Sequence, residues 1–239
     1  MLCYHAASDA WRHPLALGPA AIVRQVDALL RRGYRPATAA EVVPGRGRLL
    51  HVTFDDAYTS IERVLPELER RGVPATVFVC SGYAERGAPL AVPELTEEAA
   101  KTPAELETMA WPQLRGLAAR GVEIGSHTVS HPRLPELSDD ELARELQESR
   151  EQIEGELDRP CPLLAYPYGE YDGRVRQAAR SAGYTAAFAL RSREWRFDPY
   201  AIPRVHLLRG DGVVKATLKT VALVRRPARA LRAGVGERS

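Results

Sequence analysis

Two adjacent carboxylates, Asp55 and Asp56, directly follow an apolar, β-prone run over residues 49–54. Carboxylates side by side repel each other, and the end of a buried strand is a costly place for either charge. A divalent cation would stabilise both as anions, because one can ligate the ion while the other takes a proton from water. The doublet also suits a helix start, where the macrodipole favours acidic residues.

Two histidines, His127 and His131, lie in the segment "GSHTVSHP" with three residues between them. On a helical or turn-like segment, side chains at i and i+4 point the same way, so both imidazoles can face one metal ion. Two histidines and the Asp56 carboxylate would leave open positions for water and substrate. Unrelated surface or core histidines are the alternative, because an HxxxH pattern has little specificity.

Seven β-prone runs lie along the chain, with amphipathic helical patterns between most of them. Repeated βα units predict a parallel sheet with both faces covered. We therefore expect an α/β fold, a closed or nearly closed (β/α) barrel in the first interpretation and an open doubly wound sheet in the second. The runs are residues 2–6, 49–54, 75–82 and 122–127, "CPLLAYPYG", "TAAFAL" and "IPRVHLL".

The carboxyl ends of parallel strands meet at one edge, where both of these folds place their sites. Residues 83–108, rich in Pro and Glu, predict a long loop, and loops of this length are usually functional or mobile. Polar residues follow three of the β-prone runs at the predicted edge: Asp55 and Asp56, Ser126 and His127, and Tyr168 with Gly169.

The segments "TFDDAY", "HTVSH" and "YPYG", in this order, resemble the polysaccharide deacetylase family, the NodB-homology enzymes of carbohydrate esterase family 4. The resemblance runs from about Tyr4 to about Leu208. "MLCYH" and "YPYG" are similar to the branch that acts on poly-N-acetylglucosamine-like polymers. The resemblance implies a distorted (β/α)7 barrel and metal-dependent hydrolysis of an N- or O-acetyl group on a sugar.

The resemblance also implies a role for each residue of the first two motifs. Asp55 would be the catalytic base and Asp56 a metal ligand, with His127 and His131 as the other two ligands. The metal would be a divalent ion, zinc first, with cobalt, nickel, manganese or iron as alternatives.

Three further residues would contact the substrate. Thr128 follows the first ligand histidine, and Pro167 and Tyr168 of the third motif would line the groove. The Tyr168 backbone N–H would help to bind the oxyanion, a task that suits a strand-end amide because it requires no reorganisation.

The chain departs from the family pattern at two positions. Ala165 stands where many members have the arginine that holds the catalytic aspartate, and Arg204 in "IPRV" is the candidate replacement, able to lower the pKa of Asp55. An ordinary surface arginine is the alternative. Ala57 replaces a common glycine, which indicates a turn without positive φ.

The general acid has two candidates, because the family's Leu-x-x-His motif is absent. His206 is the only histidine after His131, and its spacing differs from the motif. His5 ends the first predicted strand at the same edge as the site. Either could protonate the leaving group, a contribution of roughly 10²–10⁴-fold.

Charge is uneven along the chain. The net charge is +2, but from Arg204 onward there are nine Lys or Arg and two acids. We expect a barrel over residues 1–210 and a basic helix and tail over 211–239, which could contact an anionic membrane surface. No stripe of basic and aromatic residues favours nucleic acid as a partner.

Targeting signals are weak at the level of sequence. The first residues show no basic segment followed by an apolar stretch, and the three cysteines form no CxxC pair. We expect a cytoplasmic protein, peripheral to the inner membrane face if the basic tail binds there.

The main hypothesis is a metal-dependent carbohydrate deacetylase with an acetylated sugar or glycoconjugate as substrate. A non-sugar amide or imide hydrolase on the same barrel is the first alternative. A degenerate glycan-binding member without activity is the second, because the arginine and the acid motif are missing.

Overall fold

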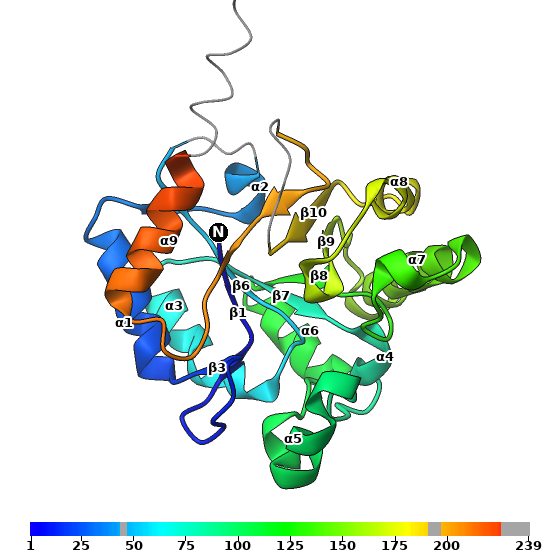
Figure 1. Cartoon of the computed structure of the whole chain (residues 1–239), viewed down its shortest axis with the longest axis horizontal. Coiled ribbons are helices and arrows are strands. Elements are labelled where there is room, and N and C mark those ends of the chain that lie inside the picture. The colour runs from blue at the N-terminus through cyan, green and yellow to red at the C-terminus, as the bar shows by residue number, and fades with distance from the viewer. Residues whose placement is uncertain (44–46, 191–196, 226–239) are drawn as a thin grey trace, which may run out of the picture.

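The computed structural model describes residues 1–43, 47–190 and 197–225. Its main sheet is parallel throughout, in the order β11-β10-β9-β8-β7-β6-β1-β12 (Figure 1). The strands are short, buried and placed where the β-prone runs predicted them. They are β1 (Leu2–Tyr4), β6 (Val52–Phe54), β7 (Ala75–Val79), β8 (Glu123–Ser126), β9 (Leu163–Ala165), β10 (Ala186–Ala189), β11 (Ile202–Pro203) and β12 (Val205–His206).

One segment, residues 202–206, joins the two ends of this sheet. Its first half, β11, pairs with β10, and its second half, β12, pairs with β1. Between them, the Arg204 N–H donates to Ala189 O at 2.9 Å and the Val205 N–H donates to Met1 O at 3.0 Å. The sheet is therefore a nearly closed barrel of seven strand segments, which confirms the expected distorted (β/α)7 barrel and excludes the open sheet.

Helices surround the sheet, as the apolar spacing predicted (Figure 1). The longest, α7, begins after Ser138, whose hydroxyl accepts from the Glu141 N–H while the Glu141 carboxylate accepts from the Ser138 N–H. This capping box explains why the helix begins at this point of the sequence. The larger helices are α1 (Pro19–Leu30), α3 (Leu65–Arg70), α6 (Trp111–Ala119), α7 (Asp139–Leu157), α8 (Gly173–Ser181) and α9 (Val213–Arg225).

The segment between β7 and α6 was predicted to be a long loop, and that prediction was wrong in detail. It folds into short helices: α4 (Ser81–Ala84), η2 (Pro93–Leu95), α5 (Thr96–Lys101) and η3 (Pro103–Glu105). Three apolar residues of this segment, Leu90, Leu95 and Leu106, pack with Trp11 in a second core. The Trp11 indole N–H also donates to Glu98 at 2.8 Å. Apolar spacing was too irregular here to predict these elements.

Smaller elements complete the fold. Two short parallel ladders pair β2 (Ala6–Ala7) with β3 (Ala16–Leu17) and β4 (Arg35–Pro36) with β5 (Leu49–Leu50). The remaining helices are α2 (Ala39–Val42), η1 (Thr59–Arg63), η4 (Leu134–Glu136) and η5 (Pro167–Gly169).

The C-terminal helix α9 lies against α1 and β12 (Figure 1). In the part of the chain that the structure describes, no helix has both the length and the apolar character needed to cross a bilayer. A separate unit over residues 211–239 stays a prediction, and residues 226–239 of the basic tail lie outside the described residues.

Candidate active site

Backbone strain is concentrated at the predicted edge of the sheet. Among the described residues, six non-glycine residues have positive φ. One of them, Asp158, lies at the end of α7, and the other five follow the carboxyl ends of β6, β8 and β9. A left-handed backbone is unfavourable for such residues and clusters at functional sites. The expectation that Ala57 needs no positive φ was therefore wrong. The five are Asp56 (68°), Ala57 (51°), Thr128 (71°), His131 (63°) and Tyr168 (59°).

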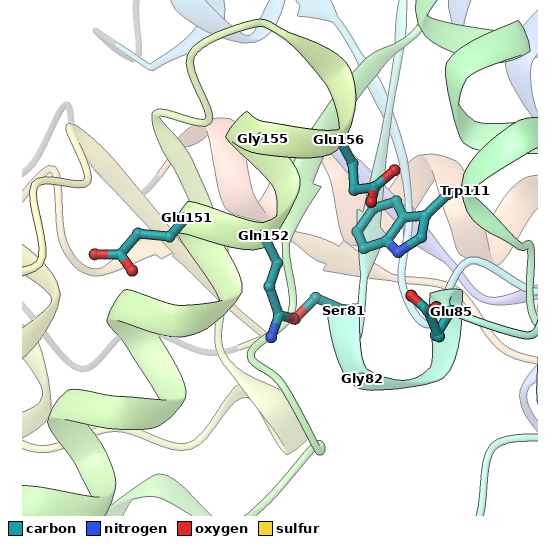
Figure 2. Close-up of a pocket in the computed structure, with 8 residues that line it drawn as sticks. All are labelled: Ser81, Gly82, Glu85, Trp111, Glu151, Gln152, Gly155 and Glu156. Atoms are coloured by element: carbon teal, nitrogen blue, oxygen red, sulfur yellow. The ribbon is translucent and has the colours of Figure 1, made fainter.

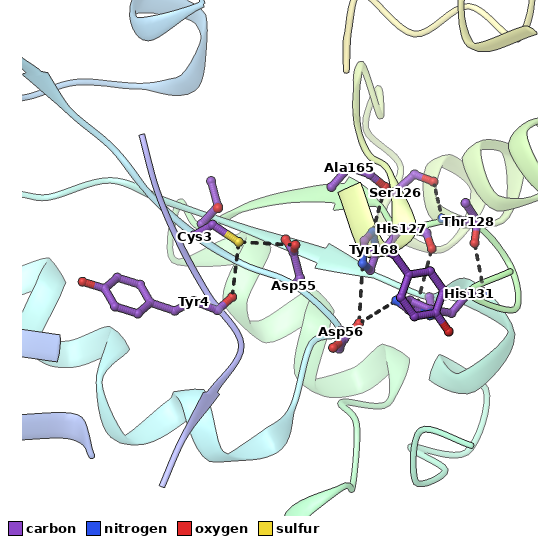
Figure 3. A network of polar contacts seen from close by, with 12 residues as sticks. Cys3, Tyr4, Asp55, Asp56, Ser126, His127, Thr128, His131, Ala165 and Tyr168 are labelled. Atoms are coloured by element: carbon purple, nitrogen blue, oxygen red, sulfur yellow. Dashed lines mark hydrogen bonds and ion pairs between the residues drawn. The ribbon is translucent and has the colours of Figure 1, made fainter. Parts of the chain in front are cut away.

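Asp56, His127 and His131 converge from two strand ends, as the sequence predicted (Figure 3). Asp56 Oδ1 lies 3.5 Å from His127 Nε2 and 3.5 Å from His131 Nε2. One ligand atom from each residue lies within 4.8 Å of the others, and all three side chains are buried. The three thus offer a two-nitrogen, one-oxygen donor set in a compact group.

The donor set fits a divalent metal ion. The Nδ1 atom of His127 lies 2.7 Å from Ala165 O, an arrangement that protonates Nδ1 and leaves the Nε2 lone pair facing Asp56. Asp56 Oδ1 is buried without a hydrogen-bond partner in the described chain. Burial and the charge of Asp55 raise the pKa of Asp56 to about 8. A cation would supply both the missing partner and the missing charge.

The loop that carries the two histidines is held from within and from α7. Thr128 Oγ1 accepts from the His131 N–H at 3.1 Å, and Ser126 Oγ accepts from the Thr128 N–H at 3.1 Å. The Thr128 side chain is fully buried. Its hydroxyl thus shapes the ligand loop, and its contact with the substrate stays a prediction.

Glu145 fixes the same loop and was missed by sequence reasoning. Its Oε2 atom accepts from the Val129 N–H at 2.9 Å and from the Ser130 N–H at 3.0 Å. On α7, Glu145 is one of many acidic residues, so only the tertiary contact distinguishes it. It is a structural support for the segment that presents the histidines.

Asp55 lies beside Asp56 but is held by a different partner. The Arg204 guanidinium donates Nη1 to Asp55 Oδ1 at 2.6 Å and Nη2 to Oδ2 at 2.8 Å. Arg204 Nη1 also donates to Thr53 Oγ1 at 3.0 Å. Burial raises the pKa of Asp55, but the charge and hydrogen bonds of Arg204, together with the nearby imidazoles of His127 and His5, outweigh it and hold that pKa well below its ordinary value. The structure thus places Arg204 beside Asp55, the contact that an arginine at position 165 was expected to make in the family pattern.

Cys3 completes the contacts of Asp55, and no sequence signal indicated it (Figure 3). Burial raises the pKa of the Cys3 thiol well above its ordinary value, so the thiol keeps its proton. Its Sγ atom donates to Asp55 Oδ2 at 3.4 Å. All three cysteines are buried and free. Among the described residues, the Cys80 thiol also reaches the site, because its Sγ atom donates to the His127 backbone carbonyl at 3.5 Å.

The two candidate acids lie together on the Arg204 side. The His5 and His206 rings have centroids 5.1 Å apart. His5 Nδ1 and His206 Nε2 are buried without hydrogen-bond partners in the described chain. Burial lowers the pKa of His5 well below its ordinary value and that of His206 to about 4, although the charge of Asp55 raises both. Both imidazoles are therefore neutral near pH 7.

The third motif places Tyr168 beside the ligand group, and Pro167 precedes it in η5. The Tyr168 ring meets the His131 ring edge to face, with centroids 4.7 Å apart. Tyr168 is half-buried, whereas Pro167 is buried. Of this pair, only the tyrosine offers a surface to a molecule entering from solvent.

A separate pocket of about 470 Å³ opens between α4, α6 and α7 (Figure 2). Its glutamates include Glu156, which pairs with Arg115 at 2.6 Å. None of the predicted catalytic or ligand residues lines it, so it is distinct from the candidate active site. It is lined by Ser81, Gly82, Glu85, Trp111, Glu151, Gln152, Gly155 and Glu156.

Proteins similar in sequence to this chain carry deacetylase names. YxkH of Bacillus subtilis (strain 168), a polysaccharide deacetylase by name, is 27% identical over 137 residues, which are 56% of this chain. The chain spans only 41% of the length of YxkH. A chitooligosaccharide deacetylase of Rhizobium leguminosarum bv. trifolii is 26% identical over 194 residues, 79% of this chain and 74% of that protein.

The fold itself is shared with a solved deacetylase. The PplD deacetylase of Streptococcus pyogenes, determined in complex with acetate, aligns with a TM-score of 0.75 over 91% of this chain and 96% of that one, at 20% identity. The family model for polysaccharide deacetylase matches residues 43–187, a span that contains the strand ends bearing the aspartate doublet, the two histidines and Tyr168. This chain belongs to the polysaccharide deacetylase family.

Proposed function

We propose that the chain is a metal-dependent hydrolase that removes an acetyl group from an N-acetylated or O-acetylated sugar or glycan. One observation carries the proposal: a buried Asp-His-His donor group lies directly beside an aspartate that is held by an arginine. The family membership, the chitooligosaccharide deacetylase relative and the acetate complex of the PplD deacetylase support it.

Asp56, His127 and His131 would hold the metal ion. A mixed nitrogen and oxygen donor set suits zinc first, with cobalt, nickel, manganese or iron as alternatives. A divalent ion in this position supplies a water of lowered pKa and polarises the acetyl carbonyl.

Asp55 is the proposed base. Because its pKa is held low beside Arg204, Asp55 is ionised throughout the neutral range, the form that a base requires. The two hydrogen bonds from the guanidinium also fix the orientation of the carboxylate. Arg204 therefore acts through Asp55, replacing the arginine that the family has where this chain has Ala165.

Two groups complete the proposed reaction. The Tyr168 backbone N–H would donate to the oxyanion that forms at the acetyl carbonyl. A histidine would then protonate the leaving group. His5 is the candidate, with His206 beside it as a possible relay. Because both imidazoles are neutral, the proton that Asp55 takes from water is the source of the proton donated to the leaving amine or alcohol.

Further proposals concern the substrate groove, the type of substrate and contact with a membrane. Pro167 would shape the floor beneath Tyr168 without a contact of its own, because it is buried. A cytoplasmic location would require a lipid-linked, nucleotide-linked or otherwise small glycoconjugate. Membrane contact through the basic tail stays a prediction, since residues 226–239 lie outside the described residues.

The test combines metal content with acetate release. Protein purified without chelator is expected to contain a divalent metal and to release acetate from a panel of acetylated chito-oligosaccharides and O-acetylated sugars. Asp55→Asn should keep the metal and lose turnover. A fully active Asp55→Asn variant would overturn the mechanism. Hydrolysis of cyclic imides without any release of acetate from the sugars would favour the non-sugar alternative.

A further inference from the structure

A charged cluster covers the outer side of Tyr168, and sequence analysis assigned it no role. Arg133 Nη2 binds Glu94 at 2.7 Å, and Arg133 Nη1 binds Glu170 at 2.7 Å. The side chains are between 35% and 45% exposed. Glu94 comes from η2, Arg133 from the loop that follows His131, and Glu170 from the end of the third motif. One guanidinium therefore connects three separate segments at the rim of the site.

The Tyr168 side chain is held by this cluster. The Arg133 guanidinium lies over its ring, 4.1 Å from the centroid. The Tyr168 hydroxyl donates to Glu94 Oε2 at 2.9 Å. On its other side, the ring meets His131 edge to face. The ring thus has a cation on one side, a metal-ligand candidate on another and a carboxylate at its tip, so that few rotamers remain open to it.

The backbone at this residue needs such support. Tyr168 has φ of 59° and ψ of 0°, a conformation that costs on the order of 1–3 kcal/mol when nothing else imposes it. The next residue, Gly169, also has positive φ, and a Cβ atom there would come within 2.6 Å of Leu190 N. The turn is therefore tightly packed behind Tyr168 and held by the charged cluster in front of it.

We propose that Arg133 and Glu94 are positioning residues, which hold the Tyr168 side chain so that its strained backbone N–H stays aimed at the oxyanion. The inference rests on the proposed function of the site and goes beyond it, because it gives a task to two residues outside the predicted catalytic and ligand set. It also gives a task to the segment between β7 and α6, whose η2 helix delivers Glu94 to the site.

The expected effect falls on turnover. Ion pairs this exposed contribute only about 0–1 kcal/mol to stability, so their removal should leave the fold intact. A displacement of about 1 Å in a catalytic group can cost about 10²-fold in rate. We expect Glu94→Gln and Arg133→Met each to lower kcat about 10-fold, with KM changed less than about threefold.

A double-mutant cycle tests the route of the effect. Tyr168→Phe removes the hydroxyl that donates to Glu94 and keeps the ring. If Glu94 acts through this hydrogen bond, Tyr168→Phe and Glu94→Gln should lower kcat by similar factors, and the double variant should lose no more than either alone. Arg115→Met is the matched control, because it breaks the similarly exposed Arg115–Glu156 pair in the other pocket and should leave kcat unchanged.

The measurements are kcat and KM for acetate release, together with zinc affinity from competition with a chelator. Zinc affinity should stay within about threefold of wild type, because the ligands themselves are untouched. Additive losses in the cycle, a change in KM alone, or a loss of kcat that matches a loss of zinc affinity would each overturn the inference and leave the proposed function standing. Wild-type protein that binds zinc but releases no acetate would overturn both.

Discussion

Asp55 and Asp56 are neighbours in the chain and almost equally buried, at 2% and 3% exposure, but they belong to two different environments. On one side, Asp55 meets the Arg204 guanidinium, the Cys3 thiol and, through Arg204, the Thr53 hydroxyl. On the other side, Asp56 meets two imidazoles that are neutral and an oxygen of its own that has no partner in the described chain.

The two pKa values diverge for this reason. Burial opposes the charge on both carboxylates, but only Asp55 has the hydrogen-bonded Arg204 beside it, which together with nearby imidazoles holds its pKa low. At Asp56, burial and the charge of Asp55 add up, and the pKa rises to about 8. The charge of Asp55 is balanced by a cationic side chain of the protein, whereas the charge of Asp56 needs a bound cation. Pairs of acids whose environments separate their pKa values commonly divide the catalytic tasks.

The largest expected difference between the two sides is catalytic. Asp56→Asn should remove metal binding and activity together, because a ligand is lost. Asp55→Asn should keep the metal and lower kcat by about 10²–10⁴-fold, the usual contribution of a general base. Metal analysis and acetate release would be measured on both, with Asp158→Asn at the exposed end of α7 as the control. Loss of metal from both variants would remove the distinction between the two sides.

Removing the compensating charge should be the largest effect on stability. Arg204→Met leaves the Asp55 carboxylate buried and unpaired, which should cost about 3–5 kcal/mol in the free energy of unfolding. The double variant Asp55→Asn, Arg204→Met should regain a large part of this loss. Chemical denaturation with the metal removed gives both values. A loss below about 1 kcal/mol for the single variant would show that water reaches this pair.

The stability of the metal-free protein should depend on pH through Asp56. Its folded pKa of about 8 lies above its ordinary value of 3.8, so the folded state binds the extra proton. This contribution is fully present below pH 3.8 and is lost as the pH rises through about 8.

The difference between wild type and Asp56→Asn isolates this contribution. Near pH 7 the metal-free Asp56→Asn protein should be more stable by roughly 2–4 kcal/mol, and the difference should shrink toward pH 4. Denaturation midpoints from pH 4 to 8 measure it. Parallel pH curves for the two proteins would contradict the raised pKa.

The smallest effect is expected at Cys3, because Arg204 already holds Asp55. Cys3→Ala should lower kcat by about two- to tenfold, in line with roughly 0.5–1.5 kcal/mol for a single neutral hydrogen bond. Cys3→Ser keeps a donor and should stay closer to wild type. Equal rates for the alanine and serine variants would assign the thiol to packing alone.

Much of the fold could be predicted because its signals are local. The β-prone runs before Asp55, His127 and Tyr168 each became a strand, and their carboxyl ends meet at one edge, as parallel strands require. The failures were also local in cause. The segment over 83–108 lacks regular apolar spacing, and positive φ at Ala57 leaves no mark on the residue type.

The candidate site divides in the same way. Spacing alone grouped His127 with His131, and the order of the motifs added Asp56. Thr128 shows the limit of that reasoning, because its position next to a ligand predicted a substrate contact, whereas the tertiary structure shows a buried hydroxyl that holds the ligand loop. Sequence reasoning could not single out three charged residues near the site, because nothing local distinguishes them from the many other charged residues of this chain. They are Glu94, Arg133 and Glu145.

The sequence by itself determined which side chains end each strand, and therefore which carboxylates and imidazoles share the edge of the sheet. It did not determine what holds Asp55, since Arg204 lies 149 residues away and reaches it only because residues 202–206 close the barrel between β10 and β1. Which residue follows the carboxyl end of a strand is a local property of the sequence. The pairing of two distant charges depends on sheet order and register, which only the complete tertiary structure decides.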